Sequence, residues 1–275
     1  RFISFPKAEC ADVSLRGRPF DGSKYEAELE GLWSETGGRI ACLITEPYLG
    51  GGGSFHPPHE YQQLLVRFCR AHEIPFILDE VQANFGRTGE MYAFETYGIE
   101  PDIVVLGKGM GNGVPVNAAA GRADLFHSLG YGGGSDTWSG HPLGCAAVLA
   151  TLDCFENFPV LAEAKDTSAA LERGLVKLKE IPIVAAVRGE AMVWGIELAA
   201  GGAEWPSSRV ANECVRRCYL GTPEGEAIHL LGPLSGNVIR VAPPLTTTVA
   251  EAEHWTGVMH WLFGEVAKEV AQTSK

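Results

Sequence analysis

Two short apolar runs in this sequence each lead into one charged residue. Residues 76–78 end at Asp79, and residues 103–106 lead into Lys108, which lies between two glycines. Short apolar runs bounded by turn-forming residues are typical of buried parallel strands. In an open α/β sheet, ligands bind beyond the carboxyl ends of such strands. We therefore expect Asp79 and Lys108 to emerge at one binding edge.

The types of these two side chains indicate a specific chemistry. A lysine at a strand end beside an apolar wall can present a neutral amine, and a neutral amine attacks carbonyl groups. Schiff-base chemistry on a pyridoxal cofactor needs such a lysine and a carboxylate that keeps the pyridine nitrogen protonated. Lys108 and Asp79 are groups of the right type. The alternative is structural, with Asp79 capping a loop and Lys108 lying on the surface after a strand.

The surrounding motifs resemble those of the class III (omega) aminotransferases, a family of fold type I that depends on pyridoxal 5'-phosphate. They occur in the family's order and spacing, as Leu-Asp-Glu-Val-Gln at 78–82, Gly-Arg-Thr-Gly at 86–89, Pro-Asp-Ile-Val at 101–104 and Gly-Lys-Gly at 107–109. The resemblance implies that Lys108 is the Schiff-base lysine and that Asp79 pairs with the pyridine nitrogen.

The same resemblance implies roles for the residues that follow Asp79. Val81 is implied to pack on the face of the cofactor ring, and Gln82 to hydrogen-bond near its phenolic oxygen. Glu80 is implied to be supporting rather than catalytic.

Composition limits the classes of partner. The chain has 275 residues, of which 45% are hydrophobic and 20% charged, as in ordinary folded domains. A net charge of −12 without a cluster of lysine and arginine argues against nucleic acid and anionic membrane surfaces as partners. No apolar run approaches the length of a membrane span, and the start of the sequence lacks the core of a signal peptide. We therefore expect a cytoplasmic protein.

Cysteine and histidine usage indicates a reducing compartment and no metal site. The seven cysteines include no Cys-x-x-Cys pair, and most lie in apolar runs. Cys214 and Cys218 could share a helix face, but no histidines stand at ligand spacing beside them.

Periodicity predicts strands and helices on both sides of the motifs. We expect helices over 23–36, 58–73, 141–157, 160–180, 208–220 and 249–269, and strands over 40–44, 76–78, 103–106, 114–120 and 183–198. The strand at 114–120 and the helix at 141–157 are expected to be buried, and 109–113 to form a flexible turn. Phe158-Pro159 breaks the helix before it, and we place the domain boundary there. We expect residues 1–157 to form a large cofactor-binding α/β domain with a mainly parallel sheet, incomplete at its N-terminus, and 158–275 a smaller C-terminal α+β domain.

Glu46 ends the strand expected at 40–44 and precedes a loop of four glycines, 50–53. It either caps the loop or lines the site, and the resemblance favours the second role. Some family members carry a glutamate in this loop that gates the arginine of the substrate site. This chain has glycines there, so the gate is in doubt.

Thr137 precedes a helix whose start is marked by Pro142, and helix N-termini favour phosphate. It is either an ordinary loop threonine or a phosphate ligand. In the family, the corresponding threonine contacts the cofactor phosphate bound to the neighbouring subunit, which implies a homodimer.

In the segment 237–245, Arg240 lies among apolar residues at the end of an expected strand. A buried guanidinium needs a partner, either a fixed acidic side chain or the carboxylate of a substrate. The resemblance implies the second, with Arg240 receiving the α-carboxylate of the substrate.

The resemblance begins partway through the family pattern. In relatives, the preceding segment supplies a phosphate-binding turn and an aromatic residue stacked on the pyridine ring, and nothing in residues 1–40 replaces them. We therefore expect either a fragment of a longer polypeptide or a truncated protein that binds cofactor poorly.

Three functions fit these observations. The first is transamination between an amino donor and a keto acid. The second is an aminomutase or racemase reaction with the same lysine and aspartate. The third is a non-catalytic remnant that serves as an oligomerising or binding module.

Overall fold

The computed structural model of the protein describes residues 1–233 and 235–273, and the chain divides into two compact units. The first unit consists of Arg1–Pro6, Pro19–Pro47 and Pro57–Val160, and the second of Lys7–Arg18, Tyr48–His56 and Leu161–Lys275. The sequence-based division at residue 157 assigned the segments Lys7–Arg18 and Tyr48–His56 to the first domain, whereas in the structure they pack with the second unit.

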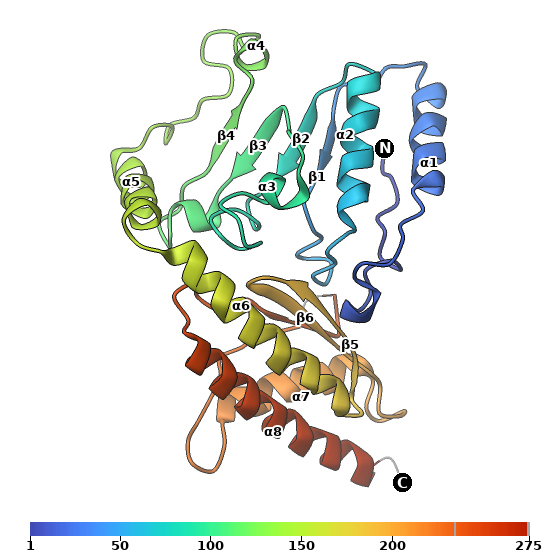
Figure 1. Cartoon of the computed structure of the whole chain (residues 1–275), viewed down its shortest axis with the longest axis vertical. Coiled ribbons are helices and arrows are strands. Elements are labelled where there is room, and N and C mark those ends of the chain that lie inside the picture. The colour runs from blue at the N-terminus through green and yellow to red at the C-terminus, as the bar shows by residue number, and fades with distance from the viewer. Residues whose placement is uncertain (234, 274–275) are drawn as a thin grey trace. The chain divides into compact units, whose positions relative to one another are not determined.

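The first unit contains a sheet with the strand order β1-β2-β3-β4 (Figure 1). Its strands are β1 (Leu43–Thr45), β2 (Phe76–Asp79), β3 (Ile103–Leu106) and β4 (Ala118–Gly121). The first three strands are parallel and β4 is antiparallel to β3. The α/β class with a mainly parallel sheet is therefore confirmed, and the carboxyl ends of β1, β2 and β3 lie at one edge.

Helices α1 (Ser23–Glu35) and α2 (His59–Ala71) pack with this sheet. The other helices of the first unit are α3 (Ala93–Tyr97), α4 (Ala123–Phe126) and α5 (Pro142–Asn157). The predicted apolar stripe of α2 is buried and packs with α1 and β2 in one core: Tyr25, Leu29, Tyr61, Leu64, Leu65, Phe68, Cys69, Phe76 and Leu78. Burial of such side chains contributes about 1.5–3 kcal/mol each, so this core holds β2 against the helices.

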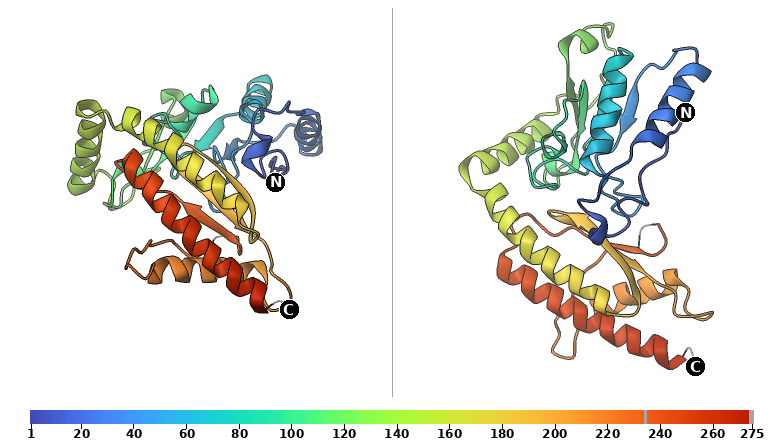
Figure 2. Two further views of the ribbon diagram at one scale, coloured as in Figure 1. Left: turned by 60° about the horizontal axis from the view of Figure 1, so that its bottom comes forward. Right: turned by 45° about the vertical axis from the view of Figure 1, so that its right-hand side comes forward.

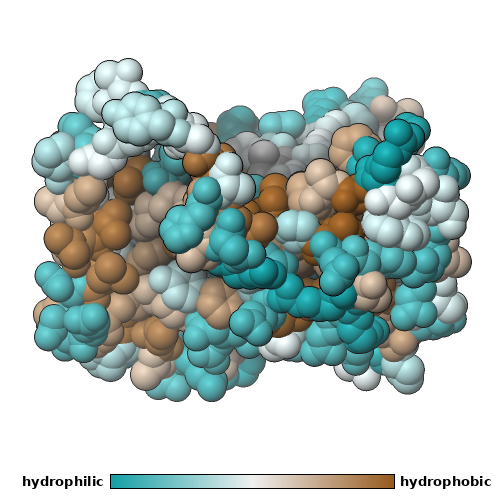
Figure 3. All heavy atoms as spheres, turned by 90° about the horizontal axis from the view of Figure 1, so that it is seen from above, coloured by the Kyte–Doolittle hydropathy of each residue, from teal (hydrophilic) through white to brown (hydrophobic). Residues whose placement is uncertain are grey.

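Two predictions of burial are wrong for the described chain. The strand expected over 114–120 is the shorter β4, which is antiparallel and exposed along its length. The helix α5 was expected to be buried, yet Leu143 and Leu149 are each 62% exposed. An apolar pattern predicts that a surface is buried, but no described residues pack over these surfaces of β4 and α5. On the face drawn in Figure 3, hydrophobic residues (brown) lie among hydrophilic ones (teal).

The buried carboxylate of Asp102 fixes the ends of the sheet that lie away from the predicted site. Its Oδ2 accepts a hydrogen bond from the Phe76 N–H at 2.8 Å, and its Oδ1 accepts from Arg70 at 2.8 Å and Arg122 at 2.9 Å. Burial alone would raise the pKa of Asp102, but these three donors outweigh it and hold the pKa below the usual value. The carboxylate therefore joins β2, the end of α2 and the segment after β4.

We expect Asp102→Asn to lower the free energy of unfolding by about 2–3 kcal/mol, because an amide accepts fewer hydrogen bonds and turns a donor toward an arginine. Denaturant titration measures this loss. Because the folded-state pKa is lowered, the stabilisation is present above about pH 4 and should be lost as the pH falls below that value. Asp124→Asn is the control, since Asp124 pairs with Arg122 only at the surface. An equal effect of both substitutions would contradict the role of Asp102.

The second unit contains an antiparallel sheet of order β5-β6-β7 and three long helices. Its elements are η1 (Val13–Leu15), α6 (Val160–Lys177), η3 (Leu178–Glu180), β5 (Val184–Glu190), β6 (Val193–Leu198), α7 (Ser207–Leu220), β7 (Val238–Val241) and α8 (Val249–Thr273). Helices α6 and α8 lie side by side in both views of Figure 2. Trp194 and Trp205 are buried in the core of this unit, whereas Trp255 and Trp261 are partly exposed.

Arg188 explains why two early segments belong to the second unit. Its side chain is almost fully buried on β5, and it donates to the backbone oxygen of Gly53 at 2.7 Å and of Ala11 at 3.1 Å. Glu197 on β6 balances the charge at 2.6 Å. One guanidinium thus holds both segments to the sheet, a long-range arrangement that the sequence does not predict.

Candidate active site

The carboxyl edge of the first sheet brings together three of the predicted site residues. Glu46 follows β1, Asp79 ends β2, and Lys108 follows β3. The strands are in parallel register, with Thr45 opposite Leu78 and Asp79 opposite the third residue of β3. These side chains therefore emerge from neighbouring strands at the same edge, as expected for an open α/β sheet.

Asp79 is half-buried at the end of β2 and has one oxygen engaged. Its Oδ1 accepts a hydrogen bond from the Val81 N–H at 3.1 Å. Among the described residues, none donates a hydrogen bond to the second oxygen. The turn thus orients the carboxylate and leaves one oxygen available to a ligand.

Lys108 starts a 3₁₀ turn, Lys108–Met110, with a backbone φ of 45°. Residues other than glycine rarely adopt this left-handed conformation, and strained backbone of this kind is concentrated at functional sites. A backbone hydrogen bond closes this turn, since the Gly111 N–H donates to the Lys108 oxygen at 3.2 Å. A side chain at Gly111 would meet the Val114 oxygen at 2.1 Å, so this position needs glycine.

The expectation of an apolar wall around Lys108 is not met within the described residues. The side chain of Lys108 is exposed. Its amine forms no hydrogen bond or ion pair with any residue that the structure describes, so it is free to react with a ligand.

Val81 and Gln82 lie in the turn that follows Asp79. The backbone oxygen of Glu80 accepts hydrogen bonds from the N–H groups of Ala83 and Asn84, both at 2.9 Å. Val81 packs over the residue before Lys108, since a Cβ added to Gly107 would lie 3.3 Å from Val81 Cγ1. Gln82 is half-buried in the same turn. An apolar contact surface therefore lies between the ends of β2 and β3.

Thr137 lies in the exposed loop between α4 and α5, outside this turn. The helix begins at Pro142, as predicted. The neighbouring Asp136 uses its carboxylate locally, because its Oδ1 accepts from the Trp138 N–H at 2.7 Å. The described chain by itself gives Thr137 no ligand.

Arg240 lies on β7 in the second unit and is half-buried. It lines a cavity of about 560 Å³ whose other walls include Leu230, Trp255 and Met259. Within residues 1–233 and 235–273, no carboxylate lies within ion-pair distance of its guanidinium. The alternative of a fixed ion pair is therefore not found in the described chain.

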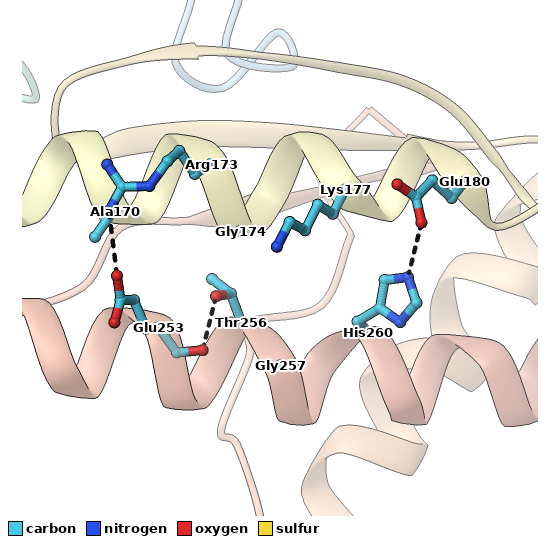
Figure 4. A pocket seen from close by; sticks show the side chains of 9 residues that line it. All are labelled: Ala170, Arg173, Gly174, Lys177, Glu180, Glu253, Thr256, Gly257 and His260. Carbon is cyan, nitrogen blue, oxygen red and sulfur yellow. Dashed lines mark hydrogen bonds and ion pairs between the residues drawn. The ribbon is translucent and has the colours of Figure 1, made fainter.

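A second cavity, of about 620 Å³, lies between α6 and α8 (Figure 4). Two contacts cross the groove, Arg173 with Glu253 at 3.2 Å and His260 with Glu180 at 3.9 Å, and Lys177 also lines it. It contains none of the predicted site residues, and its carboxylates already have partners. We do not assign the active site to it.

In the part of the chain that the structure describes, no group of three or more histidine, cysteine, aspartate or glutamate side chains could hold a metal ion. No single described helix is long and apolar enough to cross a membrane, and only the consecutive helices over 142–180, taken together as a bent pair, reach that length and composition.

No motif or spacing in the sequence predicts the contacts of Glu80. Its side chain is fully buried, and its two carboxylate oxygens accept hydrogen bonds from the Ala93 and Phe94 N–H groups, each at 2.7 Å. Burial raises the pKa of Glu80 to about 7, although these hydrogen bonds oppose the shift. Its place between Asp79 and Val81 was the only hint, because nothing in the sequence pairs it with α3.

The chain belongs to the class-III aminotransferase family, whose model matches residues 5–262. It is 32% identical to the 5-aminovalerate aminotransferase DavT of Pseudomonas putida over 83% of this chain and 53% of that protein. It is 34% identical to the acetylornithine aminotransferase of Agrobacterium fabrum over 82% of this chain and 53% of that protein. The chain thus spans about half the length of these relatives.

Solved structures agree with this assignment. The ornithine aminotransferase of Toxoplasma gondii matches with a TM-score of 0.78 and 26% identity, over 90% of this chain and 55% of that chain. A transaminase from the marine bacterium Virgibacillus matches with a TM-score of 0.77 and 26% identity, over 90% of this chain and 58% of that chain. The fold is therefore that of the fold type I aminotransferases.

The family uses pyridoxal phosphate, and the residues at the strand edge fit this group. A carboxylate with one oxygen available ends β2, and an amine with no described partner follows β3. Val81 supplies an apolar surface between them. These are the groups needed to hold a pyridine nitrogen, an aldehyde carbon and a ring face.

Proposed function

We propose that the protein is a pyridoxal-phosphate-dependent aminotransferase that transfers an amine between an amino donor and a keto acid. The observation that carries this proposal is the position of Asp79 and Lys108 at the carboxyl ends of adjacent parallel strands, each with a group available to a ligand. Membership of the class-III aminotransferase family supports the reaction type.

Each residue at the strand edge would have one task. Lys108 Nζ would bind the aldehyde carbon of the cofactor and, once released by substrate, take a proton from the substrate carbon that carries the amine. Asp79 would hold a proton on the pyridine nitrogen. Val81 and Gln82 would orient the ring. When bound, pyridoxal phosphate supplies the electron sink that stabilises negative charge on the substrate carbon.

We propose that the substrate carries a carboxylate and that Arg240 binds it. The guanidinium has no described ion-pair partner, and the loop of residues 50–53 has no acidic side chain to compete for it. Relatives are named for 5-aminovalerate and 4-aminobutyrate, both amines with a carboxylate. Glu46, at the same sheet edge as Asp79, is the candidate to face the amine end of the substrate.

Arg240→Lys should raise KM for carboxylate substrates by about 10- to 100-fold, because it removes a bidentate contact worth roughly 1.5–3 kcal/mol. Simple amines without a carboxylate should be much less affected. Steady-state kinetics with matched donors measures the difference. Equal losses for both substrate types would show that Arg240 is structural and would reopen the substrate class.

We also propose a homodimer in which Thr137 binds the cofactor phosphate of the neighbouring subunit. Lys108→Ala and Thr137→Val subunits should each have low activity alone. A mixed dimer would have one intact and one doubly damaged site, so random mixing should restore about a quarter of wild-type activity. Activity after mixing, compared with each variant alone, tests this. No recovery would mean that each chain builds its own site.

A further inference from the structure

Glu80 is the residue of the candidate active site whose contacts have no role in the proposed reaction. Its carboxylate is fully buried and lies against the first turn of α3, where each oxygen accepts one backbone N–H. These donors belong to Ala93 and Phe94, the first two residues of the helix. Unpaired N–H groups at a helix start favour a carboxylate, so the side chain anchors α3.

The backbone of Glu80 connects the same residue to the catalytic strands. Its N–H donates to the Val105 oxygen at 2.9 Å, which extends the pairing of β2 and β3 past Asp79. Its oxygen accepts the N–H groups of Ala83 and Asn84 and so closes the turn that carries Val81. That turn presents the Val81 N–H to the Asp79 carboxylate.

We propose that Glu80 is a positioning residue that sets the orientation of the Asp79 carboxylate by fixing the turn of residues 80–84 to the start of α3. This inference rests on the proposed function, in which Asp79 holds the proton of the pyridine nitrogen. Glu80 touches neither substrate nor cofactor, and it acts through the Val81 N–H.

The geometry requires a carboxylate of this length. A glutamine at position 80 has one acceptor oxygen, and its NH₂ group would face a second backbone donor. An aspartate keeps the charge but is one methylene shorter, so it cannot reach both N–H groups without moving the turn. If only the negative charge mattered, aspartate would restore function and glutamine would not.

Amide hydrogen exchange on the cofactor-free protein tests whether Glu80 fixes the turn of residues 80–84 to the start of α3. At about pH 8.5, where Glu80 is ionised, exchange at residues 81–84 and 93–94 should be at least about tenfold faster in Glu80→Gln and in Glu80→Asp than in wild type. The control is Glu95→Gln on the same helix, because Glu95 binds a single N–H, that of Tyr92, and glutamine can still accept it. Unchanged exchange at 81–84 in both Glu80 variants would overturn the proposal.

A double-mutant cycle tests the link to Asp79. Glu80→Gln alone should lower kcat by about tenfold with little change in KM, and should lower it by less than about twofold further in an Asp79→Asn background. Glu95→Gln should leave kcat unchanged. Fully additive losses would show that Glu80 does not act through Asp79. If wild type had no aminotransferase activity, the proposed function would fail, and the exchange experiment would still decide whether Glu80 fixes the turn.

Discussion

Lys108→Ala should abolish covalent attachment of pyridoxal phosphate and lower turnover by at least about 10³-fold. The substitution removes both the amine that binds the cofactor and the base that moves the substrate proton, and loss of such a base alone costs about 10²–10⁴. Absorbance of the bound cofactor and steady-state turnover measure the two losses.

The control for this variant is Lys268→Ala, which removes an exposed lysine of α8. It should keep both the bound cofactor and the rate. Because the Lys108 amine has no described partner in the fold, Lys108→Ala should also retain the thermal stability of the cofactor-free protein. Wild-type turnover in Lys108→Ala would rule out the assigned chemistry.

Asp79→Asn should retain bound cofactor and lose turnover by about 10²-fold or more, because a neutral amide cannot stabilise the positive charge of a protonated pyridine nitrogen. The fold should tolerate the change, since the Asn oxygen can still accept the Val81 N–H that Asp79 Oδ1 now binds. Turnover and cofactor content, measured on the same sample, separate the two effects.

Asp124→Asn, the same chemical change at an exposed position, is the control and should keep full turnover. Near-normal turnover in Asp79→Asn would contradict the role of the carboxylate. Loss of cofactor and rate together would mean that Asp79 serves binding rather than the chemical step.

The sequence predicted the parts of the site that depend on local pattern. The apolar runs before Asp79 and Lys108 are strands β2 and β3, and their parallel pairing brings both residues to one edge. The apolar stripe of α2 is buried where its period placed it. These features follow from hydrophobic periodicity and turn signals, which act over a few residues.

Features that depend on distant partners could not be predicted in this way. Asp102 binds Arg70, which is 32 residues away, and the side chain of Arg188 binds the oxygen of Gly53 across 135 residues. No rule based on residue spacing predicts contacts between residues so far apart in the sequence. The burial predicted for β4 and α5 was also wrong for the described chain. An apolar pattern indicates that a surface is buried, but it does not say which part of a polypeptide or assembly buries it.

The most direct test of the account is to identify the residue that binds the cofactor. The protein loaded with pyridoxal phosphate would be reduced with borohydride, digested and analysed by mass spectrometry, with Lys108→Ala treated in parallel. We predict that the reduced cofactor is found on the peptide that contains Lys108 and that the variant carries none. Reduced cofactor on any other lysine, or in equal amount on Lys108→Ala, would contradict the assignment of Lys108 and with it the proposed active site.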